Sequence, residues 1–432
     1  LSTGNSIGVF QFESKGMRSV LSQVKPRQLE ELIAVMALYR PGPMESIPKY
    51  IHNRNYPQNV EYPVPQMKEI LDITYGCMVY QEQVMEICRK LAGYSYGRAD
   101  IVRRAMSKKK HEVMEKEREN FVSGAIKNKI PEKVARDIFY EMMNFASYAF
   151  NKSHAAAYGY LAYKTAYLKC FYYKYYMSSL MTSVLDNTDK VVDYIRDCEY
   201  NGVKILNPDI NESYEGFTPI KSGIRYALLA IKNLGRNAIR SIIDERNCNG
   251  RFTSFENFCE RIIGKDVNRR AVESLIKCGA FDNLGHTRRW MLTNYEEFFD
   301  NATVTSRTNI DGQLDFFGMP QINSVPEVRR NVTGDMNEFS QKELLAMEKE
   351  VIGIYISGHP VSPYFSLGRA CGFKTAEEIL NINNENVGVE AVVDIKSRRM
   401  GTTKKNGKMC FIIAEDSTSS IEMIAFPEVF ST

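Results

Sequence analysis

The stretch LEELIAVMALYRPGP, Leu29 to Pro43, carries a helical pattern followed by its terminator. Apolar residues recur at helical spacing as far as Tyr39, and the RPGP that follows ends the pattern because proline cannot continue a helix. The same spacing returns in QVMEICRKLAGY, Gln83 to Tyr94, after a Pro-bearing stretch at 57–65. Patterns of this kind extend from Gln28 to about Asn201 and predict one large helical domain.

The rest of the chain changes character twice. The turn-rich NPDINESYEGF, Asn207 to Phe217, leads into shorter helices that end near Asn301, and a polar stretch follows to about Gly334. Helix returns in SQKELLAMEKE from Ser340, and the runs NVGVEAVVDI, KMCFIIAED and IEMIAF then predict short strands separated by the turn RRMGTTKKNGK. We therefore expect a multi-domain, mainly α protein with these parts: 1–207, a large helical domain; 208–300, a helix-hairpin-helix domain; 301–337, a linker; 338–384, a helical connection; 385–432, a partial β-barrel.

Composition excludes several classes of protein. The formal net charge of +4, from 56 basic and 52 acidic residues, means that any nucleic-acid surface must come from local clustering. Lysines interrupt the aromatic run at 158–181, so we expect no membrane helix and a soluble protein. The 9 cysteines include no C-x-x-C, which indicates reduced thiols, a cytoplasmic location and no zinc site. The N-terminus lacks both Met and a signal-peptide pattern, so we expect a cut point there.

The first candidate site is the basic segment GRADIVRRAMSKKK, Gly97 to Lys110, in which only Asp100 opposes the cations. On a helix, Arg104 and Lys108 form a like-charged i, i+4 pair, which is unfavourable unless an anion lies between them. Adjacent arginines offer forked donors and lysines offer point charges, as a polyphosphate requires. Arg103, Arg104, Lys108 and Lys109 are the candidates; a solvated basic helix face is the alternative.

A second candidate is FNKSHAAAYGYLAYKTAYLKCFYY, Phe150 to Tyr173. Aromatic rings and cations share one predicted helical face there, as base stacking and phosphate contact require, although such a stripe more often belongs to the core. The face comprises Tyr160, Lys164, Tyr167, Phe171 and Lys174. The preceding NKSH places Ser153 and His154 near a helix start, where backbone N–H groups favour an anion.

The third segment, IRYALLAIKNLGRNAIRSIIDER from Ile224 to Arg246, predicts a helix, a hairpin at Lys232 to Gly235 and a second helix. Such a hairpin directs backbone N–H groups at a phosphate, so its binding ignores base sequence. Asn replaces the usual first glycine and tolerates left-handed geometry better than most residues. A similar unit follows at 267–285. A helical hairpin packed only for stability is the alternative. The candidate DNA-binding residues are Lys232, Asn233, Gly235, Arg236, Lys164 and Tyr167.

The polar linker contains one apolar island, QLDFF, Gln313 to Phe317. Apolar anchors in such a stretch dock into a groove of a partner or of a neighbouring domain, and the pattern alone favours neither.

Two-metal polymerisation chemistry needs clustered carboxylates, and this chain has no D-x-D. The sequence therefore offers binding segments without a metal-binding catalytic centre.

Five segments, in order, resemble the fingers region of the bacterial DNA polymerase III alpha subunits, which are C-family replicative DNA polymerases. They are GVFQFESKGM (Gly8 to Met17), ALYRPGP (Ala37 to Pro43), TYGCMVYQEQVM (Thr74 to Met85), RRAMSKKK (Arg103 to Lys110) and FNKSHAAAY (Phe150 to Tyr158). The resemblance implies a fragment of a DNA-directed DNA polymerase, running from the fingers to the start of an OB-fold that binds single-stranded template. It also implies that the three catalytic aspartates and the Mg²⁺ ligands lie outside this chain, so the fragment should be inactive alone and bind no cofactor.

The resemblance assigns roles to residues already singled out. Arg103 and Arg104 would contact the triphosphate of the incoming dNTP, with Lys108 and Lys109 nearby and with Arg40, Ser153 and His154 as further candidates. The hairpin region would hold duplex DNA, and Gln313, Leu314, Asp315, Phe316 and Phe317 resemble a motif that binds the sliding clamp. The implied partners are primer–template DNA, the incoming dNTP, the clamp (beta), the clamp loader and a proofreading exonuclease. A non-enzymatic DNA-binding or clamp-tethering protein built from the same modules is the alternative.

Overall fold

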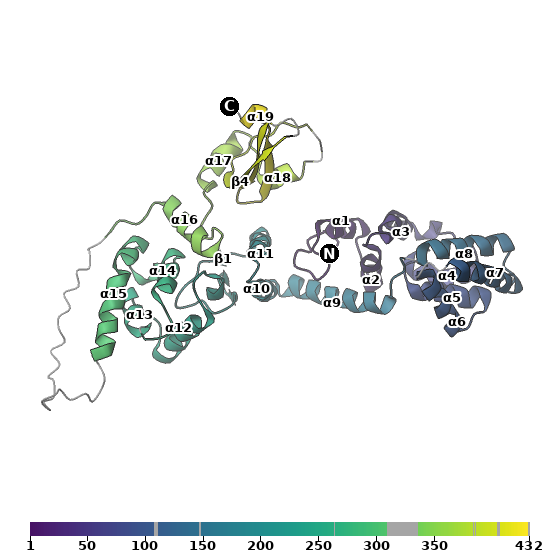
Figure 1. The fold of residues 1–432 in the computed structure, drawn as a ribbon, viewed down its shortest axis with the longest axis horizontal. Helices are drawn as coiled ribbons and strands as arrows, with labels where there is room; N and C mark the ends of the chain where they lie inside the picture. The colour runs from purple at the N-terminus through teal and green to yellow at the C-terminus, as the bar shows by residue number, and fades with distance from the viewer. Residues whose placement is uncertain are drawn as a thin grey trace. The chain divides into compact units, whose positions relative to one another are not determined.

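The computed structural model describes residues 1–107, 111–146, 148–262, 264–308, 336–382, 384, 386–403 and 407–430 (Figure 1). The described residues are mainly α-helical, as expected from the sequence, and contain two small three-stranded sheets, of which only the C-terminal one was expected. Its internal contacts divide it into two units, Leu1–Tyr173 and Lys174–Thr432. The division falls inside the predicted first domain, and the five domain bounds stay predictions.

The first unit is helical throughout the described part. Its elements are α1 (Lys15–Val24), α2 (Leu29–Leu38), η1 (Pro43–Ser46), α3 (Ile47–Asn55), η2 (Pro57–Asn59), α4 (Pro65–Leu71), η3 (Asp72–Thr74), α5 (Gln81–Ala92), α6 (Tyr96–Ser107), α7 (His111–Lys127), α8 (Glu132–Ala146) and α9 (Lys152–Phe171). The two helices predicted from periodicity are confirmed as α2 and α5. The predicted terminator after α2 is confirmed too: Gly42 has φ +99°, and a Cβ there would lie 2.4 Å from the Tyr148 ring.

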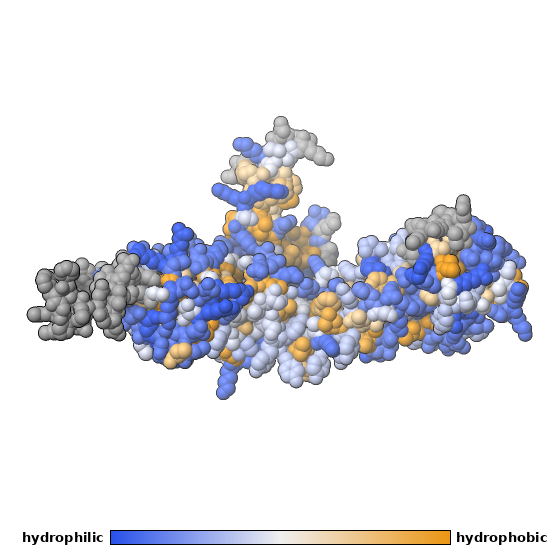
Figure 2. All heavy atoms as spheres, turned by 60° about the horizontal axis from the view of Figure 1, so that its bottom comes forward, coloured by the Kyte–Doolittle hydropathy of each residue, from blue (hydrophilic) through white to orange (hydrophobic). Residues whose placement is uncertain are grey.

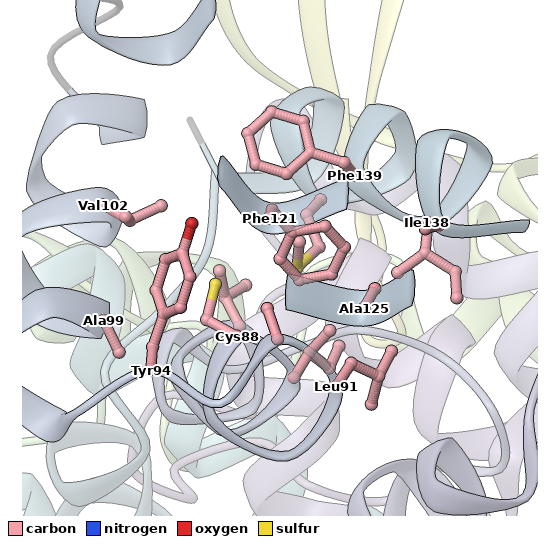
Figure 3. Packing of buried hydrophobic residues seen from close by; sticks show 14 of the residues in the cluster. Cys88, Leu91, Tyr94, Ala99, Val102, Phe121, Ala125, Ile138 and Phe139 are labelled. Atoms are coloured by element: carbon pink, nitrogen blue, oxygen red, sulfur yellow. The ribbon is translucent and has the colours of Figure 1, made fainter. Parts of the chain in front are cut away.

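Helices α5 to α8 surround one hydrophobic core (Figure 3). In α5 the apolar side chains at positions 84, 87, 88 and 91 repeat at helical spacing, and all four are fully buried. Phe121 of α7 meets Phe139 of α8 with ring centroids 5.4 Å apart. Burial raises the pKa of the Cys88 thiol to about 12. The thiol therefore stays protonated and acts here as a small apolar side chain.

A second core lies between α1, α2, α3 and α9. Helix α2 is buried on nearly every side, and α9 runs beside it (Figure 1). The contact face of α9 carries small residues at Ala155, Gly159 and Ala162, and a Cβ on Gly159 would lie 2.9 Å from Ile33. Small side chains on α9 therefore set the close approach of the two helices.

The second unit begins within α10 and contains both sheets. Its elements are α10 (Tyr173–Ser183), α11 (Thr188–Tyr200), β1 (Ile205–Leu206), β2 (Thr218–Ile220), β3 (Gly223–Arg225), η4 (Leu228–Ala230), α12 (Arg236–Asn249), α13 (Phe255–Ile262), α14 (Arg269–Lys277), η5 (Asp282–Leu284), α15 (Arg288–Thr308), α16 (Gln341–Ile352), α17 (Ser362–Ala370), α18 (Ala376–Leu380), β4 (Asp394–Thr402), β5 (Lys408–Glu415), β6 (Ser420–Ala425) and α19 (Pro427–Phe430).

The predicted helix from Ile224 to the hairpin is wrong. Ile224 lies in β3, which pairs in parallel with β1 and antiparallel with β2. Ile224 and Tyr226 are buried while Arg225 between them is half-buried, which is the alternation of a strand. A single 3₁₀ turn, η4, then leads to the hairpin.

The C-terminal sheet has the order β4-β5-β6, with antiparallel pairs (Figure 1). Strands β5 and β6 confirm two of the predicted runs. The first run is placed wrongly, because β4 begins only at Asp394 and continues through the RRMGT expected to be a turn. Gly401 made that stretch resemble a turn; in the strand it lies against the Phe411 ring, where a Cβ would come within 2.9 Å.

A buried ionic cluster joins several helices of the second unit. The guanidinium of Arg288 donates to both carboxylate oxygens of Asp282, at 2.9 and 2.7 Å, and to Glu348 Oε1 at 3.2 Å. Glu348 is fully buried and also accepts from the hydroxyl and N–H of Ser357, at 2.6 and 3.1 Å. Arg288 therefore provides the cation that makes burial of Glu348 tolerable.

We predict that Arg288→Met destabilises the second unit by about 3–5 kcal/mol, because it leaves the Glu348 charge buried without a cation. Trp290, the only tryptophan, lies 4% exposed in this unit and reports its unfolding by fluorescence in urea. Arg240→Met, at an exposed position on α12, is the matched control. Equal urea midpoints for the two variants would contradict the prediction, and adding Glu348→Gln should restore part of the lost stability.

Candidate nucleotide and nucleic-acid sites

The start of α5 is paired with the segment that leads into α9. Phe150 N donates to Val79 O at 3.3 Å and Gln81 N donates to Phe150 O at 2.8 Å, forming a parallel bridge between Tyr80 and Phe150. The adjacent Glu82 carboxylate accepts from Asn151 Nδ2 at 2.8 Å and from Lys152 N at 2.9 Å. The TYGCMVYQEQVM and FNKSHAAAY motifs, almost seventy residues apart in the chain, therefore meet.

The arginine pair of α6 lies beside this junction. Asp100 Oδ1 accepts from Nε and Nη2 of Arg103 at 2.9 and 2.7 Å, and Asp100 Oδ2 lies 2.8 Å from Arg104 Nε. Hydrogen bonds from Arg103, followed by the charges of both arginines, lower the pKa of Asp100 against the opposing effect of burial. The Arg103 side chain is 21% exposed and that of Arg104 is 68% exposed.

The sequence identified Asp100 as the opposing charge, and the structure shows it bound to both arginines at once. Arg103 Nη1 also donates to Gln81 Oε1 at 3.0 Å, which attaches α6 to the start of α5. Lys108 and Lys109 lie outside the described residues, so their predicted roles are untested.

Arg40, a weaker candidate, reaches the same junction from the end of α2. Its Nη2 donates to Tyr148 O at 3.0 Å, its Nε donates to Ala37 O at 3.1 Å, and its guanidinium lies 3.9 Å from the centroid of the Phe150 ring. Burial lowers the pKa of Arg40 from its usual value, although a guanidinium remains charged at neutral pH. Arg40 thus fixes the segment ahead of α9.

Ser153 and His154 lie in the first turn of α9, as predicted. Asn151 caps the helix by accepting from His154 N at 2.9 Å. The His154 ring packs between Phe150 and Tyr158, with centroid distances of 5.2 and 4.3 Å. Asn151 and Glu82 already accept from backbone N–H groups of this turn, which sequence reasoning did not anticipate.

The aromatic face of α9 is exposed. Tyr160, Tyr167 and Phe171 are 52%, 45% and 66% exposed, opposite the small residues that pack on α2. The core interpretation is therefore wrong for these rings. Lys164 Nζ lies 4.7 Å from the Tyr160 ring centroid, so cation and aromatic ring are adjacent as predicted.

Lys174 does not share that face. Helix α9 ends at Phe171, and Lys174 lies in α10 with its Nζ donating to Ile220 O at 2.7 Å.

Figure 2 shows that hydrophobic residues on the face in view form small separate groups among hydrophilic ones.

The hairpin ahead of α12 has the predicted backbone. Asn233 has φ +64°, in the left-handed region, and Gly235 is the N-cap residue of α12. Asn233 Nδ2 donates to Ser274 Oγ of α14 at 3.1 Å. Asn268 caps α14 by accepting from Ala271 N at 2.9 Å, and an open hollow of about 430 Å³ is lined from both helix starts. Two helix N-termini thus face one hollow, the arrangement that favours an anion.

The two cations of this hairpin have protein partners. Lys232 Nζ donates to Glu350 O at 2.8 Å, and Arg236 forms an ion pair with Glu215. Lys232 does not line the hollow, whereas Arg236, Asn237 and the acidic Asp266 do.

Two family models match the chain. Residues 1–129 match the bacterial DNA polymerase III alpha subunit finger domain, and residues 202–291 match a helix-hairpin-helix motif. The chain is also similar over its full length to proteins named DNA polymerase III subunit alpha: 39% identical to that of Borreliella burgdorferi and 38% to that of Bacillus subtilis. For Neisseria meningitidis serogroup B the identity is 42% over 97% of the chain.

The chain is thus similar, over nearly its whole length, to one part of the bacterial DNA polymerase III alpha subunits. It spans 37% of the Borreliella relative, 38% of the Bacillus relative and 36% of the Neisseria relative. The finger-domain match contains the α6 arginine pair and Arg40, and the helix-hairpin-helix match contains both capped helix starts. The α6 arginine pair and the hairpin therefore fall within family-matched regions, whereas the α9 segment does not.

Within the described residues, no group of three His, Cys, Asp or Glu side chains is placed to hold a metal ion. No helix in the described part of the chain is long and apolar enough to cross a membrane. The QLDFF motif at 313–317 lies outside the described residues.

Proposed function

We propose that this chain is part of a replicative DNA-directed DNA polymerase in which it binds the triphosphate of the incoming nucleotide, holds primer–template DNA and tethers the enzyme to a sliding clamp. One observation carries the nucleotide site: α2, α5, α6 and α9 bring Arg40, Arg103, Arg104 and the NKSH segment to one junction, although they are distant in sequence. The similarity to DNA polymerase III alpha subunits, and the finger-domain match over residues 1–129, support the assignment.

The chemistry of the junction suits a polyphosphate. Two arginines of α6 offer forked donors, and Arg104 presents most of its side chain to solvent. The role of these residues would be charge neutralisation and positioning during nucleotidyl transfer. Mg²⁺ would be held by carboxylates outside this chain and would supply the two-metal chemistry.

The duplex site would use the hollow between α12 and α14. Backbone N–H groups at two helix starts can hold a phosphate without reading bases, which suits a protein that moves along any sequence. The exposed rings of α9 with Lys164 would contact single-stranded or primer–template DNA by stacking. A non-enzymatic DNA-binding and clamp-tethering protein would need these surfaces but not the arginine pair.

The full-length parent protein should extend a primer in a metal-dependent reaction, and Arg103→Ala with Arg104→Ala should lower kcat/KM for the nucleotide by about 100-fold or more. Arg98→Ala is the matched control, because Arg98 lies on the same helix but pairs with Glu117 at 3.1 Å. Normal extension by the double variant would remove the site assignment. Absence of extension by the unmodified parent would favour the non-enzymatic alternative.

Gly235→Asp should weaken duplex binding by about tenfold or more, because a carboxylate at the start of α12 repels the phosphate that would bind there. The fold should be retained: Asp is a preferred N-cap residue, and a Cβ on Gly235 meets no heavy atom within 4 Å. Asn247→Asp places the same charge near the other end of α12 and should have little effect. Anisotropy of a labelled duplex across salt concentrations tests this, and a flat salt response would contradict phosphate binding.

A peptide spanning residues 311–319 should bind a bacterial sliding clamp, because its apolar side chains would anchor in a groove of the partner. Replacing Gln313, Phe316 and Phe317 with Ala should abolish binding, whereas Asp311→Ala should not. Calorimetry with the purified clamp measures both. Equal affinity of the triple variant would mean that the motif is not a clamp ligand.

A further inference from the structure

Gln81, the first residue of α5, contacts both parts of the junction with its side chain. Its Nε2 donates to Ala149 O at 3.0 Å, just ahead of the FNKSH segment, and its Oε1 accepts from Arg103 Nη1 at 3.0 Å. We propose that Gln81 is a positioning residue for nucleotide binding: it fixes the α6 arginine pair relative to the start of α9. This inference rests on the proposed function of the arginine pair.

The two neighbours require a bridging side chain that can both accept and donate a hydrogen bond. An arginine side chain only donates hydrogen bonds and a backbone carbonyl only accepts them, so the bridging group must accept on one side and donate on the other. Gln81 does both with one planar group. A carboxylate would face the Ala149 carbonyl with a second acceptor, and an apolar side chain would reach neither partner.

The bridge continues through Arg103 to Arg104. Arg103 uses Nη1 for Gln81 and uses Nε and Nη2 for Asp100 Oδ1, while the second oxygen of Asp100 meets Arg104. Each contact restricts the next side chain in the series. Because a misplacement of about 1 Å in a positioned group can cost about 100-fold in rate, this restriction has a functional consequence.

The fold itself does not depend on the Gln81 side chain. The pairing of α5 with Phe150 uses the backbone of Gln81, and Glu82 binds Asn151 and Lys152 independently. Gln83 offers the contrast: it is 5% exposed, and its amide binds Val79 N, Tyr80 N, Thr74 Oγ1 and Ile70 O. Gln83 holds the helix start together, whereas Gln81 reaches outward to the arginine.

A double-mutant cycle in the full-length parent polymerase tests the inference. Primer extension is measured for Gln81→Leu, Arg103→Ala and the combined variant, with KM for the nucleotide and kcat determined separately. Gln81→Leu should raise KM about tenfold, the loss of one hydrogen bond to a charged group, with an unchanged thermal midpoint. In the Arg103→Ala background the same substitution should change KM little, because the two residues act as one unit.

Three outcomes would overturn the inference. Gln81→Leu could leave KM unchanged, could raise it equally in both backgrounds, or could lower the thermal midpoint in proportion to activity, as a structural residue would. Gln81→Glu keeps an acceptor for Arg103 and should lie between the parent and Gln81→Leu. If Arg103→Ala and Arg104→Ala have no effect, the proposed function fails as well; if they impair extension while Gln81→Leu does not, only the inference about Gln81 fails.

Discussion

The geometry of the first unit depends on two backbone hydrogen bonds between the start of α5 and Phe150. They join segments that are far apart in sequence, and Val79, Tyr80 and Phe150 all pack in the core between α1, α2, α3 and α9. Without the pairing, the α6 arginines would still lie beside α5, but the position of the NKSH segment would be set only by the packing of α9. The parallel bridge and the Glu82 contacts beside it thus bring the α6 arginines and the start of α9 together.

Much of the helical fold could be predicted, because helices α2 and α5 show their period within the chain itself. The short sheet β1-β3-β2 could not: strands of two or three residues contain too few positions to display alternation. Strand β4 was missed for another reason. Its arginines and Gly401 resemble a turn, and the space beside the Phe411 ring that glycine occupies depends on pairing with β5.

The candidate sites likewise divide into features that local sequence reveals and contacts between distant residues that it does not. Residue type and local spacing identified the arginine pair, the start of α9 and the left-handed Asn233, since each is a property of a few adjacent residues. The contacts of Gln81 with residues 22 and 68 positions away carry no local signal. Nor did local spacing show that Glu82 and Asn151 already accept hydrogen bonds from the first turn of α9.

On the proposed function, Asp100 determines how a triphosphate would enter the junction. Asp100 is bound to both arginines, so an incoming anion would meet arginines that are already partly neutralised. Binding would then exchange one partner for another. For Arg104 this exchange costs little, because an ion pair with a side chain 68% exposed contributes about 0–1 kcal/mol. Arg103 differs, since its side chain is 21% exposed and it is bound by both Asp100 and Gln81. On the proposed function, the Arg104 side chain would leave Asp100 and bind the phosphates. Arg103 would stay bound to Asp100 and Gln81 and so keep α6 in position.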